Sequence, residues 1–178
     1  MTKKGHLLFT SNAMGAFLIL SGYNIHNIPT HFIPLFPSII FGLYLGSLLP
    51  DIDDPRSYIG RIFTPLAYGF HVALGHRGLI HSFMFSILIG LLSLFCPMYS
   101  FGFYFFIACG IGCLLHDIAD MLTDGGIKGF FFPFFRENRI VLLPSFLRIK
   151  TNTVSEYLFF IPMFFLLGFF ILVFLQKI

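Results

Sequence analysis

Five apolar runs, each 17 to 22 residues long, constrain this sequence more than any other feature. They cover residues 7–23, 32–49, 79–95, 101–122 and 157–175. A helix that crosses the hydrocarbon core of a bilayer needs about 20 mostly apolar residues. Only 11% of the 178 residues are charged, against roughly 25% in soluble domains. We therefore predict an all-α membrane protein, a compact bundle of about five transmembrane helices that forms one integral-membrane domain over residues 1–178.

The first two runs carry features that modify this prediction. Polar and small residues interrupt the first run, which favours a helix packed against other helices over one that faces lipid. Lys3 and Lys4 resemble the basic region of a signal peptide, but no small-residue cleavage site follows, so we expect the segment to be retained. Pro34 and Pro37, near the start of the second run, predict a tilt or kink there.

Two long polar connections, residues 50–78 and 123–156, separate the runs. Within the first, residues 59–74 are mostly apolar but too short to span, so we expect them to lie along the membrane interface or to re-enter it. Within the second, residues 136–151 hold two short apolar stretches around Pro144 and Ser145, which predict a small hairpin.

Charge placement predicts the orientation. With five spans, ten of the 11 Lys and Arg residues fall on the side of the N-terminus, and only Lys177 falls on the other. The positive-inside rule then places the N-terminus and both long connections in the cytoplasm and the C-terminus outside. The net charge of +3 is scattered and forms no basic stripe, so we expect membrane lipids as partners and no nucleic acid. The three cysteines lack the spacing of a disulfide or zinc scaffold and are interpreted as small core residues.

Imidazoles and carboxylates gather at the predicted cytoplasmic ends of four helices. Nitrogen and carboxylate oxygen donors together suit zinc, manganese or iron. Asp51 and Asp53 follow the second run and can face one cation if the turn is extended, although such a pair at a helix end is also typical of a solvated cap. His6, at the mouth of the first run, is either a further ligand or a solvated flank.

The segment GHRGLIHS contributes His76 and His81 on either side of Arg77, whose planar fork can hold an oxyanion. The competing interpretation is a juxtamembrane arginine with incidental histidines. In the fourth run, His116 and Asp120 are four residues apart and share a helix face. They form either a functional site, which is the default for ionisable groups in a membrane helix, or a structural pair.

Three further acids complete the candidate set. Asp124 extends the face of His116 and Asp120 if that helix continues, whereas Asp117 points elsewhere, as a supporting carboxylate or a cap. Glu156 begins the last run, where the helix dipole favours a carboxylate.

These segments, in the order GHLLF, LLPDIDDPRSYIGR, GHRGLIHS and HDIADMLTDGG, resemble the YdjM-like family of LexA-regulated, membrane-bound bacterial proteins assigned as metal-dependent hydrolases. The resemblance covers about residues 5–133 and implies a location in the bacterial inner membrane. It departs at Asp54, where the family often has histidine, at Ile80 and at Asp124. The metal ligands that the resemblance implies are His6, Asp51, Asp53, His76, His81, His116 and Asp120.

We therefore expect a hydrolase that uses one or two divalent ions, zinc first, on a phosphoester or lipid-linked substrate. A metal-activated water would be the nucleophile. Arg77 would hold the substrate's anionic group, and Asp54, Asp117 or Asp124 would orient an imidazole or accept a proton. The alternative is a divalent-cation transporter or sensor that uses the same cluster. Such a protein would need ionisable groups across the midplane, and the outer halves of the runs hold almost none.

Overall fold

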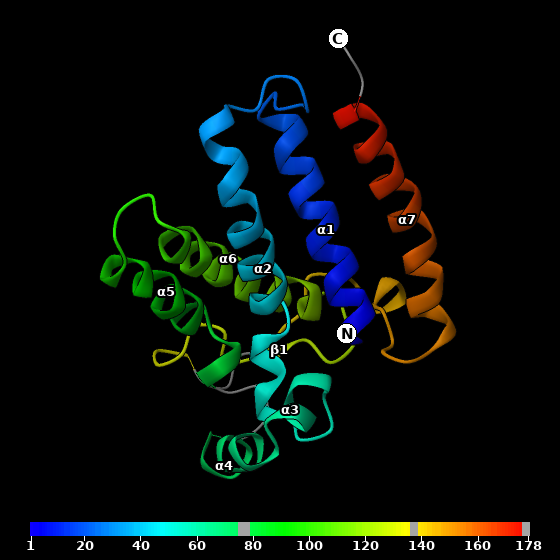
Figure 1. The fold of residues 1–178 in the computed structure, drawn as a ribbon. Coiled ribbons are helices and arrows are strands. Elements are labelled where there is room, and N and C mark those ends of the chain that lie inside the picture. The colour runs from blue at the N-terminus through cyan, green and yellow to red at the C-terminus, as the bar shows by residue number, and fades with distance from the viewer. Residues whose placement is uncertain (75–78, 136–138, 176–178) are drawn as a thin grey trace.

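The computed structural model describes residues 1–74, 79–135 and 139–175, and this part of the chain is mostly helical (Figure 1). Its α-helices are α1 (Lys3–Leu20), α2 (Phe36–Gly46), α3 (Tyr58–Ile62), α4 (Thr64–Leu74), α5 (Phe83–Leu91), α6 (Phe101–Met121) and α7 (Val154–Leu175). The 3-10 turns are η1 (Thr30–Leu35), η2 (Leu49–Asp53), η3 (Leu79–His81), η4 (Leu92–Phe95) and η5 (Ser145–Leu147). Serine side chains cap three helix starts, where Ser57, Ser82 and Ser100 accept hydrogen bonds from backbone N–H groups.

Helix α6 is the centre of the packing. Helices α1, α2 and α5 all contact it, and α7 packs against α1. The short helices α3 and α4 lie beyond α2, at the end of the molecule that holds the N-terminus (Figure 1). Most ligand candidates predicted from the sequence belong to the helix ends that meet on this side of α6.

The backbones of α2 and α6 touch because three glycines lie between them. A Cβ atom added at Gly46 would lie 2.0 Å from the carbonyl oxygen of Cys109, and one added at Gly112 would lie 2.3 Å from that of Leu43. Gly42 approaches the carbonyl oxygen of Phe105 in the same way. Small residues four apart are a common means of close helix packing in membranes. This contact brings the end of α2 directly beside the last turns of α6.

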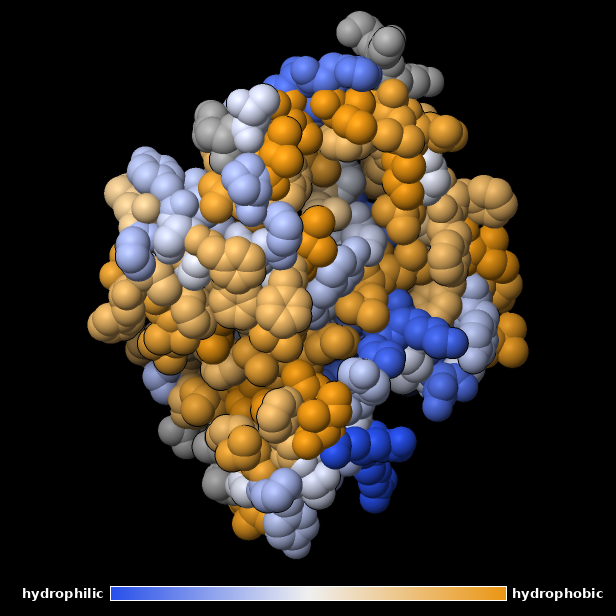
Figure 2. Space-filling model, viewed as in Figure 1, coloured by the Kyte–Doolittle hydropathy of each residue, from blue (hydrophilic) through white to orange (hydrophobic). Residues whose placement is uncertain are grey.

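Two of the described helices, α6 and α7, are long and apolar enough to cross a bilayer, with 21 and 22 residues. The apolar helices Phe32–Gly46 and Phe83–Phe95 are shorter. Helix α7 has only Glu156 and Met163 buried and exposes large apolar side chains along its length. On the face of the molecule seen in Figure 2, mostly hydrophobic residues cover the middle, and hydrophilic residues lie at the loop after α1 and near the N-terminus. This surface suits a lipid environment.

Each predicted apolar run contains a helix, with local differences. The second run begins as η1, which contains Pro34, and Pro37 lies in the first turn of α2, so the α-helix is shorter than the predicted span. The first run packs as expected, with Thr10 and Asn12 buried. Residues 59–74 fall in α3 and α4, which leave Ile62 and other large apolar side chains exposed.

The second long connection contains two short antiparallel strands, but they pair differently from the predicted hairpin. Strand β1 (Ile127–Lys128) pairs with β2 (Arg139–Ile140). The stretch after Pro144 instead forms η5 and then joins the end of α6, where the Ile149 N–H donates to the carbonyl of Leu122. Pairing with the helix end satisfies these backbone groups in place of a hairpin partner.

Candidate metal centre

Four elements far apart in the sequence bring buried imidazoles and carboxylates together at one end of the bundle. Helix α1 supplies His6, η2 supplies Asp51 and Asp53, η3 supplies His81, and α6 supplies the rest. Six of these ionisable side chains are at most 2% exposed: His6, Asp53, His81, His116, Asp117 and Asp120. Burying this many ionisable groups is costly unless they are paired or bind a cation.

His116 has the hydrogen-bonding pattern of a metal ligand. Its Nδ1 lies 2.7 Å from the carbonyl oxygen of Ser47, the residue that follows α2. A carbonyl only accepts, so Nδ1 carries the proton and the neutral ring has its lone pair on Nε2. Within the described residues this Nε2 has no hydrogen-bond partner. It faces two carboxylate oxygens instead, Asp51 Oδ1 at 3.7 Å and Asp120 Oδ2 at 4.0 Å.

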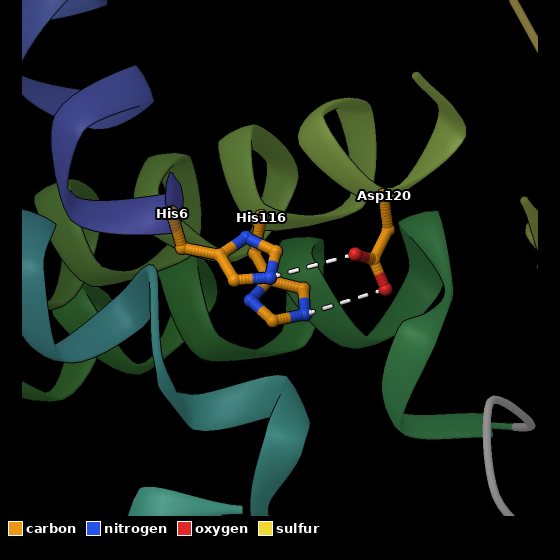
Figure 3. Close-up of side chains that lie close together, drawn as sticks. All are labelled: His6, His116 and Asp120. Atoms are coloured by element: carbon orange, nitrogen blue, oxygen red, sulfur yellow. Dashed lines mark ion pairs between the residues drawn. The ribbon is translucent and has the colours of Figure 1, made fainter. Parts of the chain in front are cut away.

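His6 stacks on His116 (Figure 3). The two ring centroids are 3.8 Å apart and the planes differ by 6°. His6 is fully buried, and neither ring nitrogen has a hydrogen-bond partner in the described part of the chain. Its Nε2 lies 3.4 Å from Asp120 Oδ1, which the amino group of Met1 also contacts. Both imidazoles thus approach the same carboxylate group from one side (Figure 3).

These groups fit a divalent cation. Ligand atoms lie within 4.8 Å of one another in two sets, His6 with His116 and Asp120, and Asp51 with His81 and His116. Two ligands of a tetrahedral ion at about 2.1 Å lie about 3.4 Å apart, close to the distances measured here. A nitrogen lone pair that faces carboxylates is repulsive, and a cation between them removes the repulsion.

His81 lies between two other buried carboxylates. Its Nε2 is 3.6 Å from Asp53 Oδ1, and its Nδ1 is 3.5 Å from Asp117 Oδ1. A carboxylate beside the second ring nitrogen can orient a ligating histidine, and Asp117 lies in that position, so its supporting role stays a prediction. Asp51 approaches His116, whereas Asp53 approaches His81. The two carboxylates do not face one position as expected for an extended turn, because this turn is a 3-10 helix.

The remaining predicted residues lie elsewhere. Asp54 accepts a hydrogen bond from the Arg56 N–H. Helix α6 ends at Met121, so its face does not continue to Asp124, which is on the surface 3.8 Å from Arg148. His76 and Arg77 lie outside the described residues.

Glu156 has a larger role than its sequence position indicates. It is 2% exposed and accepts hydrogen bonds from the Thr2 N–H, the Thr2 hydroxyl and the Asn152 N–H. These bonds fix the start of α1, one turn before His6, against the start of α7. The sequence indicated a carboxylate at the start of a helix, but it gave no signal for the partner Thr2, which is 154 residues away. The Ser47 carbonyl has no sequence signal, because every residue carries such a group.

The sequence matches a known protein family. The family model described as YdjM inner membrane protein matches residues 1–177. The chain belongs to this family. The YdjM family member described here is 30% identical over 138 residues to inner membrane protein YdjM of Escherichia coli K12 and of Shigella flexneri, an alignment that covers 71% of this chain and 63% of each relative.

This YdjM-family chain is also 34% identical over 123 residues to the uncharacterized protein YvsG of Bacillus subtilis 168, which covers 64% of this chain and 66% of that relative. No solved structure matches. The family and its relatives place the protein in the inner membrane, with a buried His/Asp cluster that can hold a metal ion.

Proposed function

We propose that this YdjM-family protein is a membrane-bound, metal-dependent hydrolase. The observation that carries the proposal is the environment of His116, whose Nε2 is buried, lacks a hydrogen bond within the described residues and faces two carboxylates. The proposed ligands are His6, Asp51, His81, His116 and Asp120, around one or two ions with zinc as the first candidate.

The chain's own residues prepare this centre. The Ser47 carbonyl holds the proton of His116 on Nδ1, and Asp117 orients His81. A divalent ion bound here supplies Lewis acidity and activates water at neutral pH. Asp51 is 22% exposed, in contrast to its nearly inaccessible neighbours, so substrate reaches the centre from the side of η2. We propose a phosphoester or lipid-linked substrate whose anion contacts Arg77.

We also propose five membrane crossings with the N-terminus and the centre on the cytoplasmic side. The test is cysteine labelling from outside in a variant without Cys96, Cys109 and Cys113. Asn27→Cys, in the loop after α1, should be labelled, and Tyr58→Cys, at the start of α3, should be protected. Strong labelling at Tyr58 from outside contradicts the proposed orientation.

The hydrolase is tested by measuring bound metal and turnover on the same purified protein. Wild type in detergent should hold about one divalent ion or more per chain and cleave a member of a panel of phosphoesters and esters. Asp120→Asn should lose metal and turnover together, because an amide is a poorer ligand than a carboxylate. His26→Ala, in the exposed loop after α1, is the control that keeps both.

A second variant separates an enzyme from a cation-binding protein. Arg77→Lys should keep the metal but lose turnover, because the bidentate contact with the substrate anion is lost. Metal-loaded wild type that cleaves nothing in the panel contradicts the hydrolase, and supports transport or sensing of the ion by the same cluster.

A further inference from the structure

A cavity of about 510 Å³ lies between α1, α2, α6 and the connection from α1 to α2, outside the metal centre. Among the described residues, only apolar and aromatic side chains line it, and on α1 and α6 they include Ala13, Met14, Phe17, Tyr104, Ile111 and Leu115. Cavities with such a lining exclude water and bind hydrocarbon. The proposed hydrolase chemistry uses none of these side chains.

Helices α1 and α6 both line the cavity and carry ligands of the candidate metal centre. On α1, His6, Thr10, Ala13 and Phe17 are three or four residues apart and share one face. Ala13 lies about 10 Å along the helix from His6, at 1.5 Å per residue. On α6, the lining residue Leu115 directly precedes His116. The candidate ligands therefore lie near the start of α1 and near the end of α6, at one end of the helices that bound the cavity.

Thr10 lies between His6 and Ala13 on this face of α1. It is 0% exposed and its hydroxyl has no hydrogen-bond partner within the described residues. A helical threonine commonly bonds to a carbonyl of the preceding turn, which Thr10 does not do. A polar atom at this level suits the linkage that joins the head group of a lipid to its chain.

The dimensions and the surface agree with a lipid chain. From Tyr104 to Leu115 the lining of α6 extends about 16 Å, close to half of the roughly 30 Å hydrocarbon core and so to one leaflet. Phe17 and Ile111 line the cavity and are 63% and 46% exposed. A chain can therefore enter sideways from the bilayer.

Basic side chains lie at the same end of the molecule as the metal centre, and their positive charge fits an anionic head group. Lys3 and Lys4 lie in the first turn of α1, and Lys3 Nζ is 3.4 Å from the centre of the Tyr58 ring. Arg56, which precedes α3, and Arg61, in the last turn of α3, are exposed. Hydrophilic residues gather at this end of the molecule in Figure 2. Cations at the membrane surface attract anionic lipids.

We propose that this cavity holds one hydrocarbon chain of an anionic phospholipid whose head group reaches the helix-end cluster. The identification of that lipid as the substrate rests on the proposed function. The binding itself needs no hydrolysis, and it is measured separately.

The probe is phosphatidic acid that carries a photoactivatable diazirine in one acyl chain, added to bilayer nanodiscs that contain the full-length protein. After irradiation, mass spectrometry of the digested protein should find the label on the lining residues of α1 and α6. Ala13→Phe fills the cavity and should lower this label at least threefold. Ala16→Phe, on the same helix but outside the lining, should leave it unchanged.

Equal labelling of wild type and Ala13→Phe overturns the proposal, as does a label confined to the lipid-facing side of α7. Equal labelling by a phosphatidylcholine analogue overturns the preference for an anionic head group. If Ala13→Phe fails to fold, Ile111→Phe repeats the test from α6. Labelling of the cavity by a protein that cleaves nothing contradicts only the hydrolase, and turnover without labelling contradicts only the lipid site.

Discussion

Helices α6 and α7 are nearly equal in length and are both apolar, yet they have different surroundings. Ten of the 21 residues of α6 are buried, against two of the 22 residues of α7. Helix α6 contacts α1, α2 and α5 and carries His116, Asp117 and Asp120 of the candidate metal centre, whereas α7 contacts mainly α1. Length and apolar content alone therefore do not identify the helix that carries the candidate centre.

The position of small and ionisable residues explains the difference. On α6, Ala108, Gly112, His116 and Asp120 recur every four residues and form one face towards α1 and α2. On α7, large apolar residues surround the helix, and Gly168 has nothing within 4 Å of where its Cβ would lie. Small residues admit a neighbouring backbone, and that contact shields the polar groups from lipid.

The largest expected effect comes from removing the ligand at the centre of this face. His116→Ala should lower bound metal at least tenfold, since both candidate ligand sets contain His116. Phe165→Ala on α7, where the side chain is 77% exposed, should leave metal content unchanged. Elemental analysis of the purified proteins measures both, and full metal content in His116→Ala would falsify the assignment of α6 as the ligand helix.

A smaller effect is expected from Asp117→Asn, also on α6. The amide is a weaker partner for His81 than the carboxylate, so metal affinity should fall about 10- to 100-fold while binding persists. Titration against a coloured chelator measures the dissociation constant. An unchanged constant would show that Asp117 is buried without supporting the centre.

A matched pair of glycine substitutions tests the packing itself. Gly46→Ala places a Cβ 2.0 Å from the Cys109 carbonyl oxygen and should destabilise the protein by about 1–3 kcal/mol. Gly168→Ala meets no atom and should be neutral or stabilise α7 by up to about 1 kcal/mol. Thermal unfolding in detergent compares the two. Equal midpoints would contradict the close contact between α2 and α6.

The smallest effect is expected beyond the end of α6. Asp124 pairs with Arg148 on the surface, where ion pairs contribute less than about 1 kcal/mol. Asp124→Ala should therefore change neither the unfolding midpoint by more than a degree or two nor the metal affinity. A clear loss of metal in this variant would extend the functional face past Met121.

The sequence predicted the helical fold and many of the clustered side chains because both leave local signals. Apolar runs reveal helices, and ionisable groups in such runs are rare enough to stand out. The tight α2–α6 contact was missed, although Gly42 and Gly46 show the spacing that permits it. Asp124 was misleading because the end of a helix depends on its caps and neighbours, which residue spacing does not specify.

Contacts made by the backbone left no signal at all. The contact between His116 and the Ser47 carbonyl, which keeps the proton on Nδ1, forms only because α6 packs against the end of α2. No residue type in the sequence signals this contact. The stretch 145–149 likewise joins the end of α6 through backbone hydrogen bonds, although its sequence predicted half of a hairpin.

The bonds from Glu156 to Thr2 have a consequence for biosynthesis. They join Thr2 to the start of α7, a helix that is synthesised about 150 residues later. This anchor for the turn before His6 therefore forms only after α7 has been synthesised and inserted. A chain that stops before α7 keeps all the candidate ligands but lacks this anchor beside His6.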